Sequence, residues 1–159
     1  MNTSILALVY VLAGAVNAQE NACIIPNCGA TLDTWSGIGG WTIADLMMGT
    51  NNLANTPDKS EHLVTSLEAP TNAGDDFGSR MSGWLMPPVT GSYEFWIASD
   101  DLGEIWLSFD DNPANKNRIC YLPYAVSPSF FDAGPEQKSS PIFLVAGQAY
   151  YYEVRFRVS

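Results

Sequence analysis

The chain has 159 residues, the length of one domain, and a formal net charge of −10. Hydrophobic residues make up 47% and charged residues 15%, a composition typical of a globular protein rather than a disordered one. The seven basic residues are scattered, whereas nucleic-acid binding needs clustered Lys and Arg. The composition therefore excludes nucleic acid as a partner and argues against electrostatic binding to an anionic membrane. The acidity fits either a cation site or plain solubility.

The N-terminal residues resemble a secretory signal peptide. Residues 1–18 contain no charged side chain, residues 5–16 are apolar, and Val16-Asn17-Ala18 has the small-x-small form that precedes cleavage. The apolar run is too short to span a bilayer, so we expect no membrane span in the mature chain. We predict either cleavage near Ala18–Gln19 or retention of residues 1–18 as an apolar arm that forms a β-strand. Both predict a secreted or cell-surface protein.

Three cysteines occur in the chain: Cys23, Cys28 and Cys120. Residues 19–34 therefore form a Cys-containing N-terminal segment. Secretion permits a disulfide. Cys23 with Cys28 would close a small loop, whereas Cys28 with Cys120 would tie this segment to the rest of the chain. The spacing does not choose between the two pairings.

Short apolar segments separated by Gly, Pro, Asn and Asp clusters make up the rest of the chain. Residues 29–40 predict a loop and an opening strand, and residues 41–46 a short helical turn or a strand. Alternation of apolar residues predicts strands at 62–67, 80–85, 93–98, 104–109, 118–122, 141–145 and 150–158. Many short strands with no long amphipathic helix indicate an all-β sandwich or barrel.

Four segments, taken in order and with their spacing, resemble the protective-antigen-type (PA-fourteen) domain. Residues 84–113 run from a Pro-Pro-x-Thr-Gly turn through an aromatic strand to a Ser-Asp-Asp loop and a second strand. The other similar segments are 35–46, 67–85 and 135–154. We assign residues 35–159 to such a domain. The resemblance implies an antiparallel β-sandwich used for extracellular recognition in adhesins, toxins and accessory regions of glycosidases, often with carbohydrate as the ligand.

The resemblance also implies a metal site. In the lectin-like branch of the family, two adjacent aspartates joined by a cis peptide bind calcium, which in turn holds sugar hydroxyls; Asp100 and Asp101 match this pair. Calcium prefers six to eight oxygen ligands. A plain turn stabilised by Asp is the other reading. The family usually continues into a Gly-rich loop and a final strand after its last aromatic strand. Because this sequence stops at Ser159, the resemblance implies missing calcium ligands and an unpaired sheet edge.

These patterns favour a non-catalytic function. His62 is the single histidine, and the sequence has no nucleophile elbow, phosphate-binding Gly loop or catalytic zinc pattern. Trp84, Trp96 and Trp106 are candidates for stacking on sugar rings, although strand positions favour packing. The leading hypothesis is an extracellular recognition or adhesion module that binds glycans through calcium. The alternatives are a filament subunit, in which a retained arm fills the strand vacancy of a neighbouring copy, and an accessory domain of a larger glycoside hydrolase.

Overall fold

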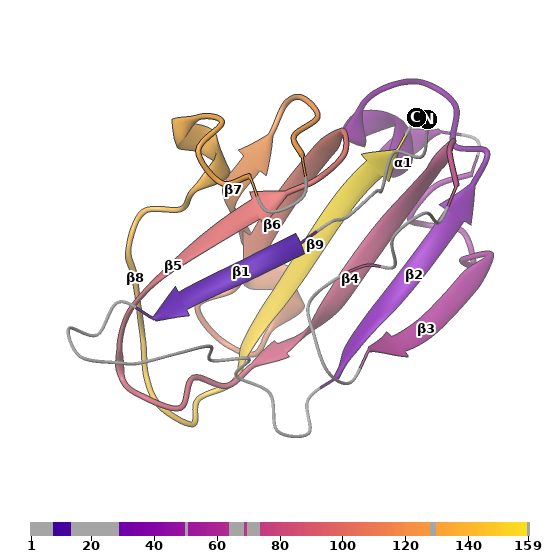
Figure 1. Cartoon of the computed structure of the whole chain (residues 1–159). Coiled ribbons are helices and arrows are strands. Elements are labelled where there is room, and N and C mark those ends of the chain that lie inside the picture. Colours follow the sequence, from indigo (N-terminus) through magenta and orange to yellow (C-terminus); the bar gives the residue numbers. More distant parts are fainter. Residues whose placement is uncertain are drawn as a thin grey trace.

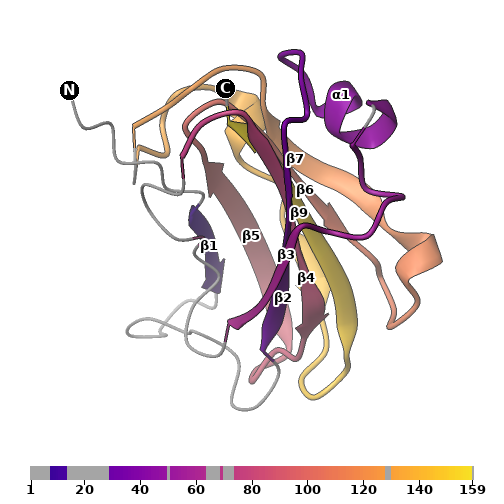
Figure 2. The same cartoon turned by 90° about the vertical axis from the view of Figure 1, so that its right-hand side faces the viewer.

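The computed structural model describes residues 8–13, 29–49, 51–63, 69, 74–127 and 130–158. Its strands form a three-stranded sheet in the order β1-β5-β8 and a six-stranded sheet in the order β3-β2-β4-β9-β6-β7. The two sheets lie face to face as separate layers (Figures 1 and 2). All strand pairs are antiparallel. The predicted antiparallel β-sandwich is therefore confirmed.

The described residues form nine β-strands, one short α-helix and two 3-10 turns. Their bounds are β1 Leu8–Ala13, β2 Ala30–Ser36, α1 Ile43–Met48, β3 Lys59–Leu63, β4 Phe77–Leu85, β5 Gly91–Ala98, β6 Leu102–Leu107, η1 Pro113–Asn115, β7 Asn117–Leu122, η2 Pro135–Gln137, β8 Ile142–Leu144 and β9 Tyr150–Val158.

Most predicted strands occur within a few residues of their expected bounds, and two differences have a local cause. The strand expected at 62–67 begins earlier, as β3, and residues 64–68 lie outside the described part of the chain. The strand expected at 104–109 ends at Leu107, because the Asp110 carboxylate accepts a hydrogen bond from the backbone N–H of Asn112 and starts a loop. Residues 43–48 are helical because Thr42 and Asp45 form a capping box.

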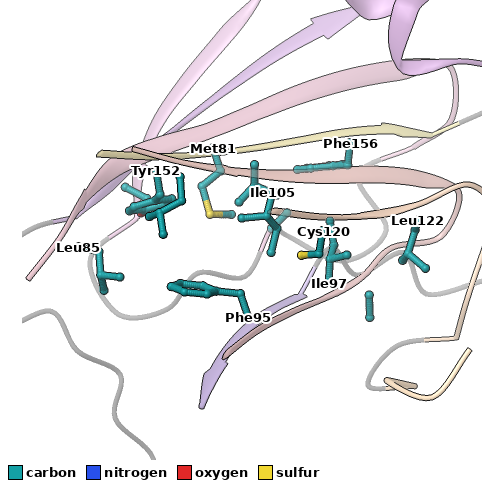
Figure 3. Close-up of a cluster of buried hydrophobic side chains, with 14 of the residues drawn as sticks. Met81, Leu85, Phe95, Ile97, Ile105, Cys120, Leu122, Tyr152 and Phe156 are labelled. Carbon is teal, nitrogen blue, oxygen red and sulfur yellow. The ribbon is translucent and has the colours of Figure 1, made fainter. Parts of the chain in front are cut away.

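The core lies between the facing sides of the two sheets. Along β5 and β6, buried residues alternate with half-buried ones, as expected for strands with one face toward the interior. Figure 3 shows how these side chains meet others from β4, β7 and β9. The fully buried side chains of this core include Tyr93, Ile97, Met81, Ile105, Leu107, Val154 and Phe156. A core of this size is the main source of the domain's stability.

Strand β9 is the centre of the large sheet and is buried on both faces. It pairs with β4 on one side and with β6 on the other. Its outward side chains are charged or aromatic and contact one another and the neighbouring strand. The Arg155 guanidinium lies 4.8 Å from the centre of the Trp106 ring of β6, and Tyr151 donates a hydrogen bond of 3.0 Å to Glu153. The last aromatic strand therefore has no unpaired edge of its own.

The N-terminal apolar segment contributes β1 at the edge of the small sheet, where it pairs with β5 of its own chain. Residues 14–28 lie outside the described part of the chain, so cleavage near Ala18 stays a prediction. The large sheet includes β2, which begins at Ala30, on the N-terminal side of the boundary predicted at residue 35. Among the described residues, no helix is long and apolar enough to cross a membrane.

Replacing Phe156 by Ala should lower the free energy of unfolding by about 3–5 kcal/mol, because the change leaves a cavity in the core. Phe156 is 1% exposed and contacts Phe77 edge to face, with 6.3 Å between ring centroids. Urea denaturation provides the measurement. The matched control is Phe143→Ala on β8, which is 65% exposed and should change stability by less than about 0.5 kcal/mol. Equal effects of the two variants would contradict the assignment of the core.

Candidate functional site at one end of the sandwich

The tight loop between β5 and β6 carries the predicted site residues, Asp100 and Asp101. Ser99 is buried at the start of this loop, and its carbonyl accepts a hydrogen bond of 2.9 Å from the backbone N–H of Val126. Gly103 follows the loop where a Cβ atom would lie 2.7 Å from the Ile97 side chain. The loop is therefore held close to the small sheet, and its two carboxylates are only partly exposed to solvent.

The backbone of the Asp pair differs from the one that the family resemblance implies. The described residues contain no cis peptide bond, so the Asp100–Asp101 peptide is trans. The expectation of a cis peptide here is wrong, and the trans form is the ordinary preference of a bond that does not precede proline. Asp101 has a φ of 142°, a conformation that residues with a side chain seldom adopt. The loop turns through this residue.

The carboxylates of Asp101 and Asp75 interact electrostatically with that of Asp100. Burial raises the pKa of the Asp100 carboxyl, and the negative charges of Asp101 and Asp75 raise that pKa further. Asp75 lies in the turn before β4, far from Asp100 in sequence. The fold therefore brings a second acidic turn to the end of the sandwich that holds the Asp100 loop, where repulsion between carboxylates favours binding of a proton or a cation.

Arg157, near the end of β9, connects the turns at this end of the molecule. Its guanidinium donates hydrogen bonds of 2.9 Å to the carbonyl of Gly40 and to the carboxylate of Asp76, and one of 3.3 Å to the carbonyl of Phe77. Its side chain is 2% exposed, whereas that of Asp76 is 62% exposed. Figure 1 shows α1, the end of β9 and the start of β4 gathered here. Arg157 thus fixes the turn that carries Asp75 and Asp76.

The residues at this end fit a calcium ion only in part. Asp100 and Asp101 supply two carboxylates, and the Ser99 hydroxyl beside them is buried without a hydrogen-bond partner. Within the described ranges, no three His, Cys, Asp or Glu side chains come together in a way that could hold a metal ion. The protein's carboxylates alone would therefore not complete a calcium shell of six to eight oxygens, and carbonyls, water or a ligand would have to provide the rest.

The three tryptophans that were candidates for sugar stacking do not gather at this end. Trp84 lies near the far end of β4, where its indole N–H donates a hydrogen bond of 3.0 Å to the carbonyl of Asp111. The rings of Trp96 and Trp106 are covered by cations, with Lys138 at 4.9 Å and Arg155 at 4.8 Å. Cation–π contact therefore occupies one face of each of these two rings. Trp84 alone of the three is largely exposed, at 45%.

Other candidate residues lie apart from the Asp loop or outside the described residues. Cys120 is a free thiol on the inner face of β7, and burial raises its pKa to about 12. Cys23 and Cys28 lie outside the described part of the chain, so their pairing stays a prediction. His62 is exposed on the edge strand β3. Sequence reasoning missed Arg157, because its role depends on contacts with two segments that are distant in sequence.

The fold defines the chain as an antiparallel β-sandwich module. A family model described as the PA14 domain matches residues 47–158. This match covers most of the chain, and the chain therefore belongs to the PA14 domain family.

Several much longer proteins contain a similar stretch. The N-acetyl-beta-glucosaminyl-glycoprotein 4-beta-N-acetylgalactosaminyltransferase 1 of Mus musculus is 34% identical over 83 residues, which cover 50% of this chain and 8% of that protein. Fibrocystin-L of Homo sapiens is 35% identical over 80 residues, or 50% of this chain and 2% of the relative. Fibrocystin of Canis lupus familiaris is 24% identical over 123 residues, or 70% and 3%. No solved structure matches the chain significantly.

Replacing Arg157 by Leu should lower the free energy of unfolding by about 3 kcal/mol, because the carbonyls of Gly40 and Phe77 would lose their hydrogen-bond donor. Thermal denaturation and urea titration provide the measurement. The control is Lys59→Leu, since Lys59 pairs with Glu61 at the surface and its side chain is 64% exposed. Such surface pairs contribute little. A control that is as unstable as the Arg157 variant would contradict the role given to Arg157.

Replacing Asp100 by Asn should stabilise the metal-free protein at neutral pH. The pKa of Asp100 is raised in the folded chain, so the ionised carboxylate opposes folding, and this penalty disappears as pH falls through the raised pKa. The Tm difference between the variant and the wild type should therefore be positive at pH 7 and shrink toward about pH 4. Asp111→Asn, in the exposed loop after β6, is the control. A Tm difference that grows as the pH is lowered would contradict this assignment.

Proposed function

We propose that this protein is an extracellular, non-catalytic recognition module that binds carbohydrate through calcium at Asp100 and Asp101. The observation that carries the proposal is that Asp100 and Asp101 lie side by side on a short loop, next to the buried and unpartnered hydroxyl of Ser99. Burial raises the pKa of Asp100, the charges of Asp101 and Asp75 raise it further, and a bound cation would offset these charges. The trans peptide of the pair makes the loop geometry differ from the one implied by the resemblance, so the site needs a direct test.

The chemistry of calcium and sugars agrees with this arrangement. Two carboxylates offset the charge of a divalent cation, and calcium accepts hydroxyl oxygens alongside carboxylates and carbonyls. A ligand with two neighbouring hydroxyl groups can therefore complete a shell that the protein fills only in part. The Ser99 hydroxyl, buried beside the pair and without a partner, is a further oxygen that a small movement could bring to the cation.

The distribution of the family supports a binding role rather than a catalytic one. Similar stretches occur in a protein named as a transferase and in fibrocystins, whose names state no reaction, and they cover 2–8% of those chains. A module that accompanies such different proteins is better explained by a shared recognition task than by a shared reaction. A role as the accessory domain of a larger glycoside hydrolase also fits a recognition module and stays a prediction.

Isothermal titration with calcium tests the proposal. The wild type should bind one calcium ion, Asp100→Ala should not bind, and Asp111→Ala should bind like the wild type, because Asp111 lies on a different loop. A glycan array probed with and without calcium then tests the ligand class, and binding should require calcium and Asp100. Equal calcium binding by both variants would show that Asp100 is not a calcium ligand. Binding to glycans in the absence of calcium would show that calcium is not needed for recognition.

A further inference from the structure

Strand β1 lies at the edge of the small sheet. Strand β1 pairs with β5 alone, and its ladder covers six positions from Leu8 opposite Ala98 to Ala13 opposite Tyr93. Within the described residues, β1 therefore has one neighbouring strand in its sheet. Removing β1 would break this one ladder and leave all pairings of the large sheet in place.

The opposite edge of β5 is held by one continuous segment, residues 137–144. Tyr93 pairs with Ile142 of β8, and the backbone of Phe95 exchanges hydrogen bonds of 2.9 and 3.0 Å with Ser139. The buried side-chain amide of Gln137 donates a hydrogen bond of 2.8 Å to the carbonyl of Ile97. The position of β5 is thus fixed without β1, so its outer edge is a preformed row of backbone donors and acceptors.

An empty outer edge on β5 would be unfavourable next to the core. The inward side chains of β5 are Tyr93, Phe95 and Ile97, which are 1%, 2% and 0% exposed. In Figure 2, β1 and β5 form one layer that faces the large sheet. Unpaired edges beside apolar surface bind other strands readily. The sequence of β1, LVYVLA, has no charge, Pro or Gly and suits an extended apolar strand.

We propose that the outer edge of β5, residues 93–98, is a strand-acceptor site that binds one extended apolar peptide antiparallel to itself. Residues 8–13 of this chain are its occupant, and their binding does not need a covalent link to the domain. This site is separate from the calcium site, and the inference does not rest on the proposed glycan function. A cut near Ala18 would convert β1 from a part of the chain into a bound peptide, and loss of that peptide would open β5 to strands of other molecules.

The test uses the full chain with a protease recognition sequence inserted between Ala18 and Gln19. The protein is folded intact, cut with the protease and passed over a gel-filtration column coupled to light scattering. The fragment of residues 1–18 should stay with the remainder in a one-to-one complex of unchanged mass. Stripping the fragment with mild denaturant and returning the remainder to buffer should lower its Tm by about 5 °C or more. Immediate separation with an unchanged Tm would overturn the proposal.

Two proline variants of the same protein test the ladder itself. Neighbouring residues of an antiparallel strand point their N–H groups alternately toward and away from the partner strand, and proline has no N–H. Tyr10 pairs with Trp96, and Val11 pairs with Phe95. The backbone N–H and carbonyl of Phe95 point to Ser139, so those of Trp96 point to β1. Tyr10→Pro should therefore release the cut fragment, and Val11→Pro should retain it. Retention in both variants would exclude ladder pairing. Loss of the fragment with dimerisation of the remainder would overturn the assignment of residues 8–13 and place a second copy at β5.

Discussion

The buried guanidinium of Arg157 is the interaction on which the candidate site depends. It lies at the end of the central strand β9 and binds the turn before α1, the first residue of β4 and the Asp76 carboxylate. Leaving a buried charge without partners is costly, so the positions of β9, of Gly40 and of the turn at Asp76 and Phe77 depend on one another. The turn that carries Asp75 is thereby held within electrostatic range of Asp100.

Strand alternation made most of the fold predictable from the sequence. The patterns at Tyr93, Phe95 and Ile97 and along residues 150–158 are those of half-buried and central strands, and both occur where expected. Strand ends were less predictable where side chains bind the local backbone, as Asp110 does after β6. The identity of the family was also readable, because it depends on the order of several segments rather than on one short motif.

The geometry of the site was less accessible to sequence reasoning. The sequence shows that Asp100 and Asp101 are adjacent, but the peptide isomer and the positive φ of Asp101 depend on how the loop crosses from β5 in one sheet to β6 in the other. Asp75 and Asp76 are adjacent in one exposed turn, and only the fold brings Asp75 within electrostatic range of Asp100 and pairs Asp76 with Arg157. The tryptophans are dispersed because they lie on three different strands, β4, β5 and β6, and β5 belongs to the other sheet.

The burial of Cys120 has a consequence for the order of oxidative folding. Thiol–disulfide exchange requires a thiolate that a partner can reach, and a pKa of about 12 within the core removes both conditions. Once β7 has closed over the interior, this sulfur takes no further part in crosslinking. After the sandwich has closed, Cys23 and Cys28 therefore have only each other as partners within the chain.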